Sequence, residues 1–273
     1  MPALLTRPVT LITLQLLAFW PVWHWYVRRM LDPSDEPYGV VSLATAAGFV
    51  LFGKWKPPLA IERKYLLLPA LLTALYAATF HLAPMSISAG VAMTAVAALI
   101  SICTSKRIFQ PGLWLLLMLA LPVMASLQFY AGFPLRVAVG KAAATLLQLS
   151  GLPVVLDGTL LCWGGHAVGI DAPCSGIKML WAGYYMTAAM SCLFQWRPRR
   201  ILFFFLITLI VVILGNTLRA TALFYVETGM IALPAWTHQG MGLCVFMLMM
   251  LTIVGIGMKY NQVNPQAENP CVS

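Results

Sequence analysis

The chain has 273 residues, of which 61% are hydrophobic and 9% charged, and its mean hydropathy is +0.86. Soluble domains carry about 25% charged residues, so this composition excludes an ordinary soluble protein and predicts an all-α, polytopic integral membrane protein. The net charge of +9 does not indicate nucleic-acid binding, because the Lys and Arg residues lie in short loops between apolar runs, where they set membrane orientation.

Apolar runs separated by short basic or proline-containing loops predict about eight transmembrane helices. We expect these spans at about residues 8–27, 39–53, 65–81, 85–103, 113–130, 174–195, 201–226 and 238–258. No internal repeat or second soluble domain is visible, so residues 1–273 are predicted to form one transmembrane domain. Its parts are spans one to five (1–130), an exterior interfacial segment (131–173), the last three spans (174–260) and a mobile polar tail (261–273).

The segment of residues 131–173 differs from the rest of the chain. Arg136, Lys141 and Gln148 interrupt an Ala/Leu-rich stretch, so residues 135–149 are predicted to form an interfacial amphipathic helix. Two apolar runs then flank Asp157-Gly158, which is typical of a short hairpin with a two-residue turn. A glycine-rich stretch follows and is expected to be irregular up to the sixth span.

The distribution of basic residues predicts the orientation of the chain. With eight spans and the amino terminus inside, the inner segments hold eleven Lys and Arg residues and the outer segments hold four. Residues 131–173 are therefore expected on the exterior side of the membrane.

Cys174 is the first candidate for chemistry. Pro173 suits the first turn of a helix, so Cys174 is predicted to lie in the first turn of the sixth span. Backbone N–H groups and the positive end of the helix dipole favour a thiolate there. Ser175 and Gly176 keep the surroundings small enough for another chain to approach. A thiol at a helix start can also serve only in packing, so the interpretation depends on its neighbours.

Two further polar residues are expected at the depth of Cys174. Counted from the inner ends of their spans, Cys174, Arg219 and His238 lie 21, 18 and 21 residues along. At about 1.5 Å per residue, all three reach the outer edge of a hydrocarbon layer about 30 Å thick.

Arg219 is the most informative of the three because it lies inside an apolar run. An arginine in a span costs at least about 2.5–3.5 kcal/mol on insertion and therefore indicates function. The alternative is an arginine that extends to the interface and only anchors the helix. Asn216 is three residues earlier on the same helical face, where it would orient the guanidinium or a substrate carbonyl, or join helices.

These three residue types suit acyl transfer. A thiolate is a nucleophile, an imidazole transfers protons near neutral pH, and a guanidinium stabilises the oxyanion of a tetrahedral intermediate. No spacing of His, Cys, Asp or Glu indicates a metal site, and no glycine-rich nucleotide loop is present, so no cofactor is expected.

Three short motifs coincide with these residues: Ala172-Pro-Cys-Ser-Gly-Ile177, Asn216-Thr-Leu-Arg-Ala220, and His238 followed by Gly240. In sequence and order they resemble the exosortase/archaeosortase family of membrane-embedded cysteine transpeptidases. The resemblance implies a multi-pass protein of the cell (inner) membrane whose catalytic Cys174, Arg219 and His238 face the periplasm or exterior. It implies substrates that are secreted proteins with a carboxy-terminal motif, a membrane helix and a basic end. The mature protein would pass to an acceptor, which could be an amine, a lipid or a polysaccharide.

Two other functions fit the same residues. A non-enzymatic membrane transport or binding protein would use Arg219 to hold an anionic ligand. A membrane acyltransferase would share the thioester step without cleaving a peptide. Cys162 and His166 also lie in the exterior segment. Cys162 would act as a second nucleophile, a disulfide partner or a packing residue, and His166 would assist the site.

Overall fold

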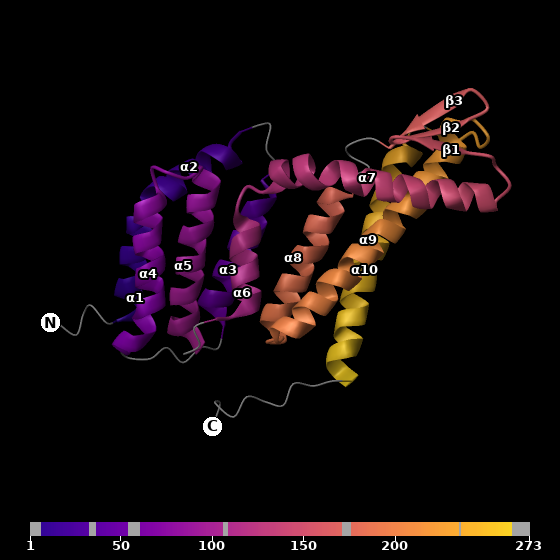
Figure 1. Cartoon of the computed structure of the whole chain (residues 1–273). Helices are drawn as coiled ribbons and strands as arrows, with labels where there is room; N and C mark the ends of the chain where they lie inside the picture. Colours follow the sequence, from indigo (N-terminus) through magenta and orange to yellow (C-terminus); the bar gives the residue numbers. More distant parts are fainter. Residues whose placement is uncertain are drawn as a thin grey trace. The chain divides into compact units, whose positions relative to one another are not determined.

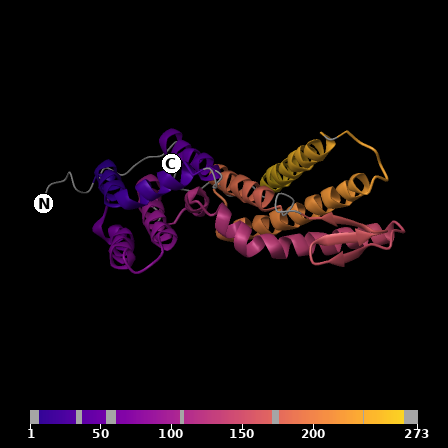
Figure 2. The ribbon, with the colours of Figure 1, turned by 90° about the horizontal axis from the view of Figure 1, so that it is seen from above.

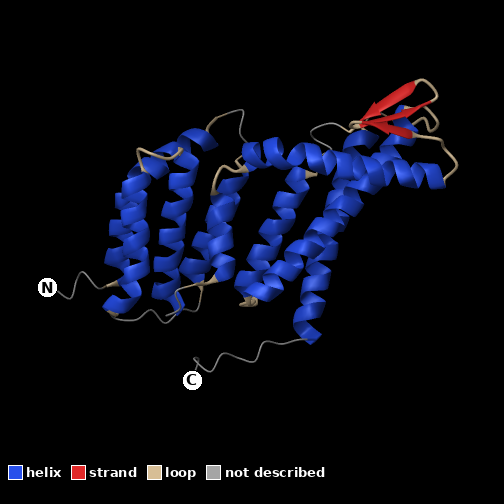
Figure 3. Cartoon of the chain, viewed as in Figure 1, coloured by secondary structure: helices blue, strands red, loops and turns tan. Residues whose placement is uncertain are grey.

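The computed structural model describes residues 7–32, 37–53, 61–105, 109–170, 176–234 and 236–263. Over these residues the chain forms ten α-helices and one small sheet of three strands (Figures 1 and 3). It divides into two compact units. Unit 1 comprises residues 1–123 and 188–198, and unit 2 comprises residues 124–187 and 199–273. The tail predicted to be mobile lies almost entirely outside the described residues.

Unit 1 consists of apolar helices. They are α1 (Pro8–Ala18), α2 (Trp20–Met30), α3 (Tyr38–Phe52), α4 (Arg63–Thr79), α5 (Met85–Ser105) and α6 (Pro111–Ala120), joined by the end of α8. The main contacts join α4 to α5, α5 to α6, and α3 to α6. Helices α3, α4 and α5 begin and end within two residues of the predicted spans, because their apolar runs are bounded by proline, glycine or charge.

Proline breaks two of the predicted spans, so the uninterrupted helices expected over residues 8–27 and 113–130 are wrong. The first is divided at Phe19, and Pro21 follows in the first turn of α2, where a missing N–H costs nothing. The second is divided at Leu121, which is extended (φ −64°, ψ 150°). Pro122 disfavours the helical conformation of the residue before it, and α7 begins only at Met124.

Three helices of the described residues are long and apolar enough to cross a membrane: α5 over residues 85–104, α9 (Pro198–Glu227) and α10 (Thr237–Val263). Counting α6 and α7 together as one broken span gives a fourth. The apolar helices α1, α3 and α4 are shorter. The membrane-embedded helical class is therefore confirmed, whereas the count of about eight spans is not.

Unit 2 contains α7 (Met124–Leu149), the sheet, most of α8 (Ile177–Leu193), α9 and α10. In Figure 1, α7 crosses α9 near the carboxy-terminal end of α9, where the two helices share buried residues. Because α6 and α7 together also satisfy the length and composition of a broken span, the interfacial position of α7 stays a prediction. The helix is longer than predicted, because it starts eleven residues before residue 135.

The predicted hairpin forms, and a third strand follows it. Strands β1 (Val155–Asp157), β2 (Leu160–Trp163) and β3 (His166–Gly169) are antiparallel in the order β1-β2-β3. The first turn consists of Gly158 and Thr159, one residue later than predicted. The second consists of Gly164 and Gly165, with φ +56° and +82°. Positive φ values suit a tight hairpin turn, so the glycines expected to make this stretch irregular instead form its second turn.

The sheet is fixed to the carboxy-terminal half of α9 by a shared core. Its buried members are Val139, Ala143, Ala144 and Leu147 of α7, Val154, Leu161, Val168 and Ile170 of the sheet region, and Ala220 and Phe224 of α9. Trp163 adds an edge-on ring contact with Phe224 at 6.4 Å. The residue next to Arg219 therefore belongs to the core that positions the sheet.

Glycines allow α8, α9 and α10 to approach closely within unit 2. A Cβ at Gly183 of α8 would lie 2.5 Å from Thr208 of α9 and 3.2 Å from Ile253 of α10. A Cβ at Gly215 of α9 would lie 2.5 Å from Met249 of α10. Figure 2 shows α9 and α10 side by side. Small residues at such contacts are typical of membrane helices, whose association depends on close packing.

Candidate active site

The segment that carries the predicted nucleophile lies outside the described residues, which resume at Gly176 after a gap that includes Cys174 and Ser175. Helix α8 begins at Ile177, so the sixth helix starts three residues later than predicted. Gly176 has φ +79°, a left-handed conformation that glycine adopts without strain. This backbone is not helical, so Gly176 precedes α8 rather than belonging to it.

Gly176 packs directly against Asn216 of α9. A Cβ at Gly176 would overlap the Asn216 amide, so only glycine fits this contact. Asn216 is 2% exposed, and its Nδ2 donates a hydrogen bond to the Val212 carbonyl at 3.0 Å. Its Oδ1 is buried and has no hydrogen-bond partner. This contact places Gly176, two residues after Cys174 in the sequence, against the face of α9 that carries Arg219 one turn further on.

Arg219 is 9% exposed, and its Nε has no hydrogen-bond partner. Its guanidinium lies on the backbone of α10, where a Cβ at Gly242 would be 3.2–3.4 Å from Nη2, Cζ and Nε. An arginine that anchors a helix to the interface keeps its head group in water. The burial of Arg219 therefore does not fit the anchoring alternative.

His238 lies at the start of α10, one helical turn before Gly242, on the face that meets Arg219. Its Nε2 is 3.7 Å from Oε1 of Glu227, the last residue of α9, and the two side chains are 48% and 41% exposed. A carboxylate that accepts a hydrogen bond from this nitrogen would hold the imidazole ring in one orientation and one tautomer. The His238–Glu227 contact thus joins the end of α9 to the beginning of α10.

Glu227 and Gly242 are site residues that the sequence reasoning missed. Glu227 is the last residue of α9, where the negative end of the helix dipole disfavours an acid. An acid in this position indicates that another group stabilises it. The local sequence does not indicate a role for Gly242, because that role is a contact with Arg219 of another helix.

The described contacts form one connected series. Gly176 touches Asn216, Arg219 lies one turn beyond Asn216 and touches Gly242, and His238 lies one turn before Gly242. Arg219 and His238 therefore share one region of unit 2 with the residue that follows Ser175. A buried cation without a hydrogen-bonded partner at Nε and a nearby imidazole suit acyl-transfer chemistry.

The other candidates, Cys162 and His166, lie on the sheet. Cys162 is half-buried on β2 and forms no disulfide with a described residue. His166 is exposed on β3 and stacks on Trp163, with ring centroids 6.4 Å apart. In the described part of the chain, no group of three or more His, Cys, Asp or Glu could hold a metal ion.

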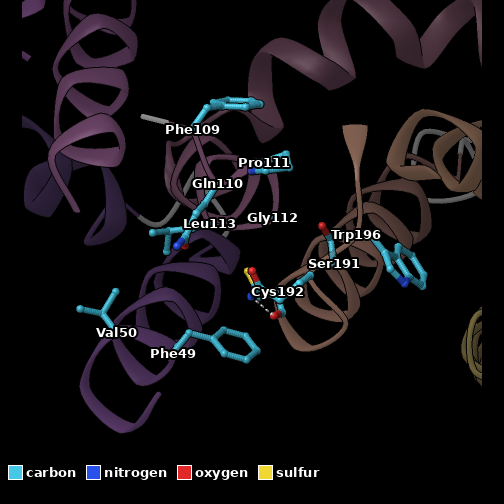
Figure 4. A pocket seen from close by; sticks show the side chains of 11 residues that line it. Phe49, Val50, Phe109, Gln110, Pro111, Gly112, Leu113, Ser191, Cys192 and Trp196 are labelled. Atoms are coloured by element: carbon cyan, nitrogen blue, oxygen red, sulfur yellow. Dashed lines mark hydrogen bonds between the residues drawn. The ribbon is translucent and has the colours of Figure 1, made fainter. Parts of the chain in front are cut away.

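A small pocket in unit 1 lies at the other end of α8 (Figure 4). Its volume is about 40 Å³, and Phe49, Gln110, Ser191, Cys192 and Trp196 are among the residues that line it. This is room for only a few water molecules. The helix α8 (Ile177–Leu193) lies between Gly176 and this pocket, so the pocket is separate from the candidate active site.

The family model for transmembrane exosortases matches residues 10–255, from α1 into α10. The matched range covers most of both units and contains all three motifs of the candidate site. No curated protein matches the chain, and no solved structure matches it.

Proposed function

Because the chain belongs to the transmembrane exosortase family, we propose that it is a membrane-embedded cysteine transpeptidase. It cleaves secreted proteins near a carboxy-terminal sorting signal, which consists of a short motif, a membrane helix and a basic end. It then transfers the new carboxyl end to an acceptor amine on a lipid, a polysaccharide or another molecule. The catalytic residues are Cys174, Arg219 and His238.

The buried guanidinium of Arg219 is the observation that carries this proposal. Arg219 lies in an apolar helix, is 9% exposed and has an unpartnered Nε. A buried charge is costly unless it is paired and hydrogen-bonded. An oxyanion that forms beside the guanidinium during acyl transfer would supply that partner, and a donor set in place before the reaction stabilises the transition state.

The reaction proceeds through a thioester. The Cys174 thiolate attacks the scissile carbonyl, and Arg219 stabilises the oxyanion of the tetrahedral intermediate. His238 then protonates the leaving amine, the C–N bond breaks, and the substrate's membrane helix is released. The acceptor amine attacks the thioester, gives its proton to His238, and expels the Cys174 thiolate.

Asn216, Ser175 and Gly176 support this chemistry. The Gly176–Asn216 contact fixes the start of α8 against α9, and hence the direction from which the nucleophile segment approaches Arg219. The orphaned Oδ1 of Asn216 is an acceptor for a backbone N–H of that segment or of the substrate.

We place the site on the outer side of the cell membrane, within one catalytic domain that comprises residues 1–273. The charge asymmetry of the loops supports this orientation. A Cys introduced at Thr159, in the first hairpin turn, should react with an impermeant thiol reagent added outside the cell. Reaction only from the cytoplasmic side would reverse the orientation.

The function is tested with purified protein in lipid vesicles, a helix-tailed substrate and a small amine acceptor. The wild-type protein should release the helix and couple the amine to the mature substrate, whereas Cys174→Ala and Cys174→Ser should retain substrate binding without cleavage. Equal coupling by Cys174→Ala would remove the nucleophile from the mechanism. Binding with no cleavage by the wild-type protein would favour a binding or transport protein.

A further inference from the structure

Within the described residues, the edge of the unit 2 sheet at β3 pairs with no further strand. In the order β1-β2-β3, strands β1 and β3 are the two edges. The contacts of the sheet with α7 are concentrated at β1 and β2, so β3 forms the edge farther from that helix. Strand β3 ends at Gly169, five residues before Cys174. This edge therefore leads into the segment that carries the proposed nucleophile.

The register of β3 against β2 shows which backbone N–H and C=O groups of β3 point toward β2 and which point away from it. Trp163 and His166 close a two-residue turn, and such closing pairs exchange both hydrogen bonds. Bonded and non-bonded pairs then alternate, so Val168 points its N–H and C=O groups toward β2. The Ile170 N–H, which donates to the Thr159 carbonyl at 2.9 Å, fits the same alternation.

Ala167 and Gly169 are the remaining residues of the strand, and their N–H and C=O groups point away from β2. No bond from these outward groups to another described residue occurs outside the sheet. The two residues are partly or fully exposed, whereas Val168 and Ile170 are buried in the core that contains Ala220, next to Arg219. The outward groups thus form a short row of donors and acceptors on a strand anchored beside the candidate site.

We propose that this edge is the docking site for the substrate: the extended peptide just before the substrate's membrane helix adds to β3 as a fourth strand. The proposal rests on the proposed function, which requires such a peptide to reach Cys174. The occupant is the substrate backbone, because Ala167 and Gly169 offer main-chain groups and small side chains and no charge. Pairing with β3 holds the substrate peptide in an extended conformation. Because the pairing uses main-chain groups, substrates with different side chains can bind in the same way.

The first test uses substrate peptides in which single backbone amides are replaced by esters, which removes one N–H at a time. Strand addition predicts a period of two: esters at alternate positions should raise KM about 2- to 10-fold each, and esters at the positions between them should not. The kcat should change little, because the reacting groups are untouched. Effects without this alternation would overturn the proposal.

The second test uses the protein. Ala167→Pro removes an outward N–H and no bond of the ladder, a position where an edge strand tolerates proline. Ala167→Val is the matched control, because it enlarges the side chain and retains the N–H. Ala167→Pro should raise KM about 2- to 10-fold relative to Ala167→Val, with kcat retained.

The outcomes separate this proposal from the function on which it rests. Equal KM values for Ala167→Pro and Ala167→Val, in an enzyme that still depends on Cys174, would overturn the docking edge and leave the transpeptidase intact. A change in oligomeric state without a change in KM would assign the edge to a second copy of the chain and also overturn it. The ester series needs no variant, so it decides the question even if Ala167→Pro fails to fold.

Discussion

Two helix contacts in this protein use a glycine to bring a polar side chain close to a backbone, and only one of them holds a charge. In unit 1, a Cβ at Gly112 of α6 would lie 2.7–2.9 Å from atoms of Ser191 and Cys192. In unit 2, a Cβ at Gly242 of α10 would lie 3.2–3.4 Å from the guanidinium of Arg219. Both contacts leave a buried atom without a hydrogen-bond partner, Ser191 Oγ in one and Arg219 Nε in the other.

The charge of Arg219 distinguishes the Gly242 contact from the Gly112 contact, which involves only neutral groups. An unsatisfied neutral hydroxyl costs about 1–3 kcal/mol, which a helix contact can absorb. A buried charge costs several kcal/mol unless it is paired, so its presence calls for a functional reason. None of the described residues that line the Cys192 pocket is a cation. A thiol in a tight glycine contact is therefore insufficient evidence for a site, and Arg219 is the feature that distinguishes the two regions.

Among the variants that test this comparison, Arg219→Lys should cause the largest loss of kcat/KM. Lysine keeps the charge and loses the planar set of donors, so kcat/KM should fall about 10²- to 10³-fold, as for the loss of an oxyanion donor. The amount of inserted protein, measured by immunoblot of membranes, should not change. A fully active lysine variant would reduce Arg219 to a membrane anchor.

Two matched glycine substitutions should sharpen the comparison. Gly242→Ala places a methyl group against the guanidinium, and a displacement of about 1 Å can cost about 10²-fold in rate, so kcat should fall about 10- to 100-fold. Gly112→Ala should instead lower stability by about 1–3 kcal/mol through overpacking. Its specific activity per folded molecule should stay at the wild-type value.

These two variants are compared by thermal inactivation and by initial rate. A loss of stability without a loss of rate in Gly242→Ala would make the two contacts equivalent. In that case the contact between Arg219 and α10 would serve only in packing.

Glu227→Gln should have the smallest effect. The Glu227–His238 pair is about half exposed and 3.7 Å apart, so it contributes about 0.2–1 kcal/mol, or about 1.4- to 5-fold in kcat/KM. Glu227→Asp should restore part of this loss. Asp157→Asn, which removes an acid from the first hairpin, is the control for the general loss of negative charge.

The double variant decides whether Glu227 acts through His238. If it does, Glu227→Gln should have no further effect in a His238→Ala protein. Additive losses would give Glu227 a separate role.

The sequence predicts the long apolar helices well and the interruptions poorly. Helices α5, α9 and α10 are continuous apolar runs, so their composition defines them. Whether a proline divides a helix depends on its surroundings: Pro122 ends one, whereas Pro69 and Pro134 lie inside α4 and α7. Local sequence alone does not separate these cases.

The candidate site is predictable only in part. Residue type and depth indicated Arg219 and His238, because a cation in an apolar run is rare. The burial of Arg219, its contact with Gly242 and the pair of Glu227 with His238 depend on how α9 and α10 pack. The third strand was missed for a similar reason, since Gly164 and Gly165 form a turn only when two strands pair.

The most direct test of the transpeptidase is to trap its covalent intermediate. Purified protein incubated with a helix-tailed substrate and no acceptor should form an adduct that hydroxylamine releases, and peptide mass analysis should place it on Cys174. His238→Ala should slow its formation, and Cys174→Ala should abolish it. Substrate cleavage without any adduct on Cys174, or cleavage by the Cys174→Ala protein, would contradict the account.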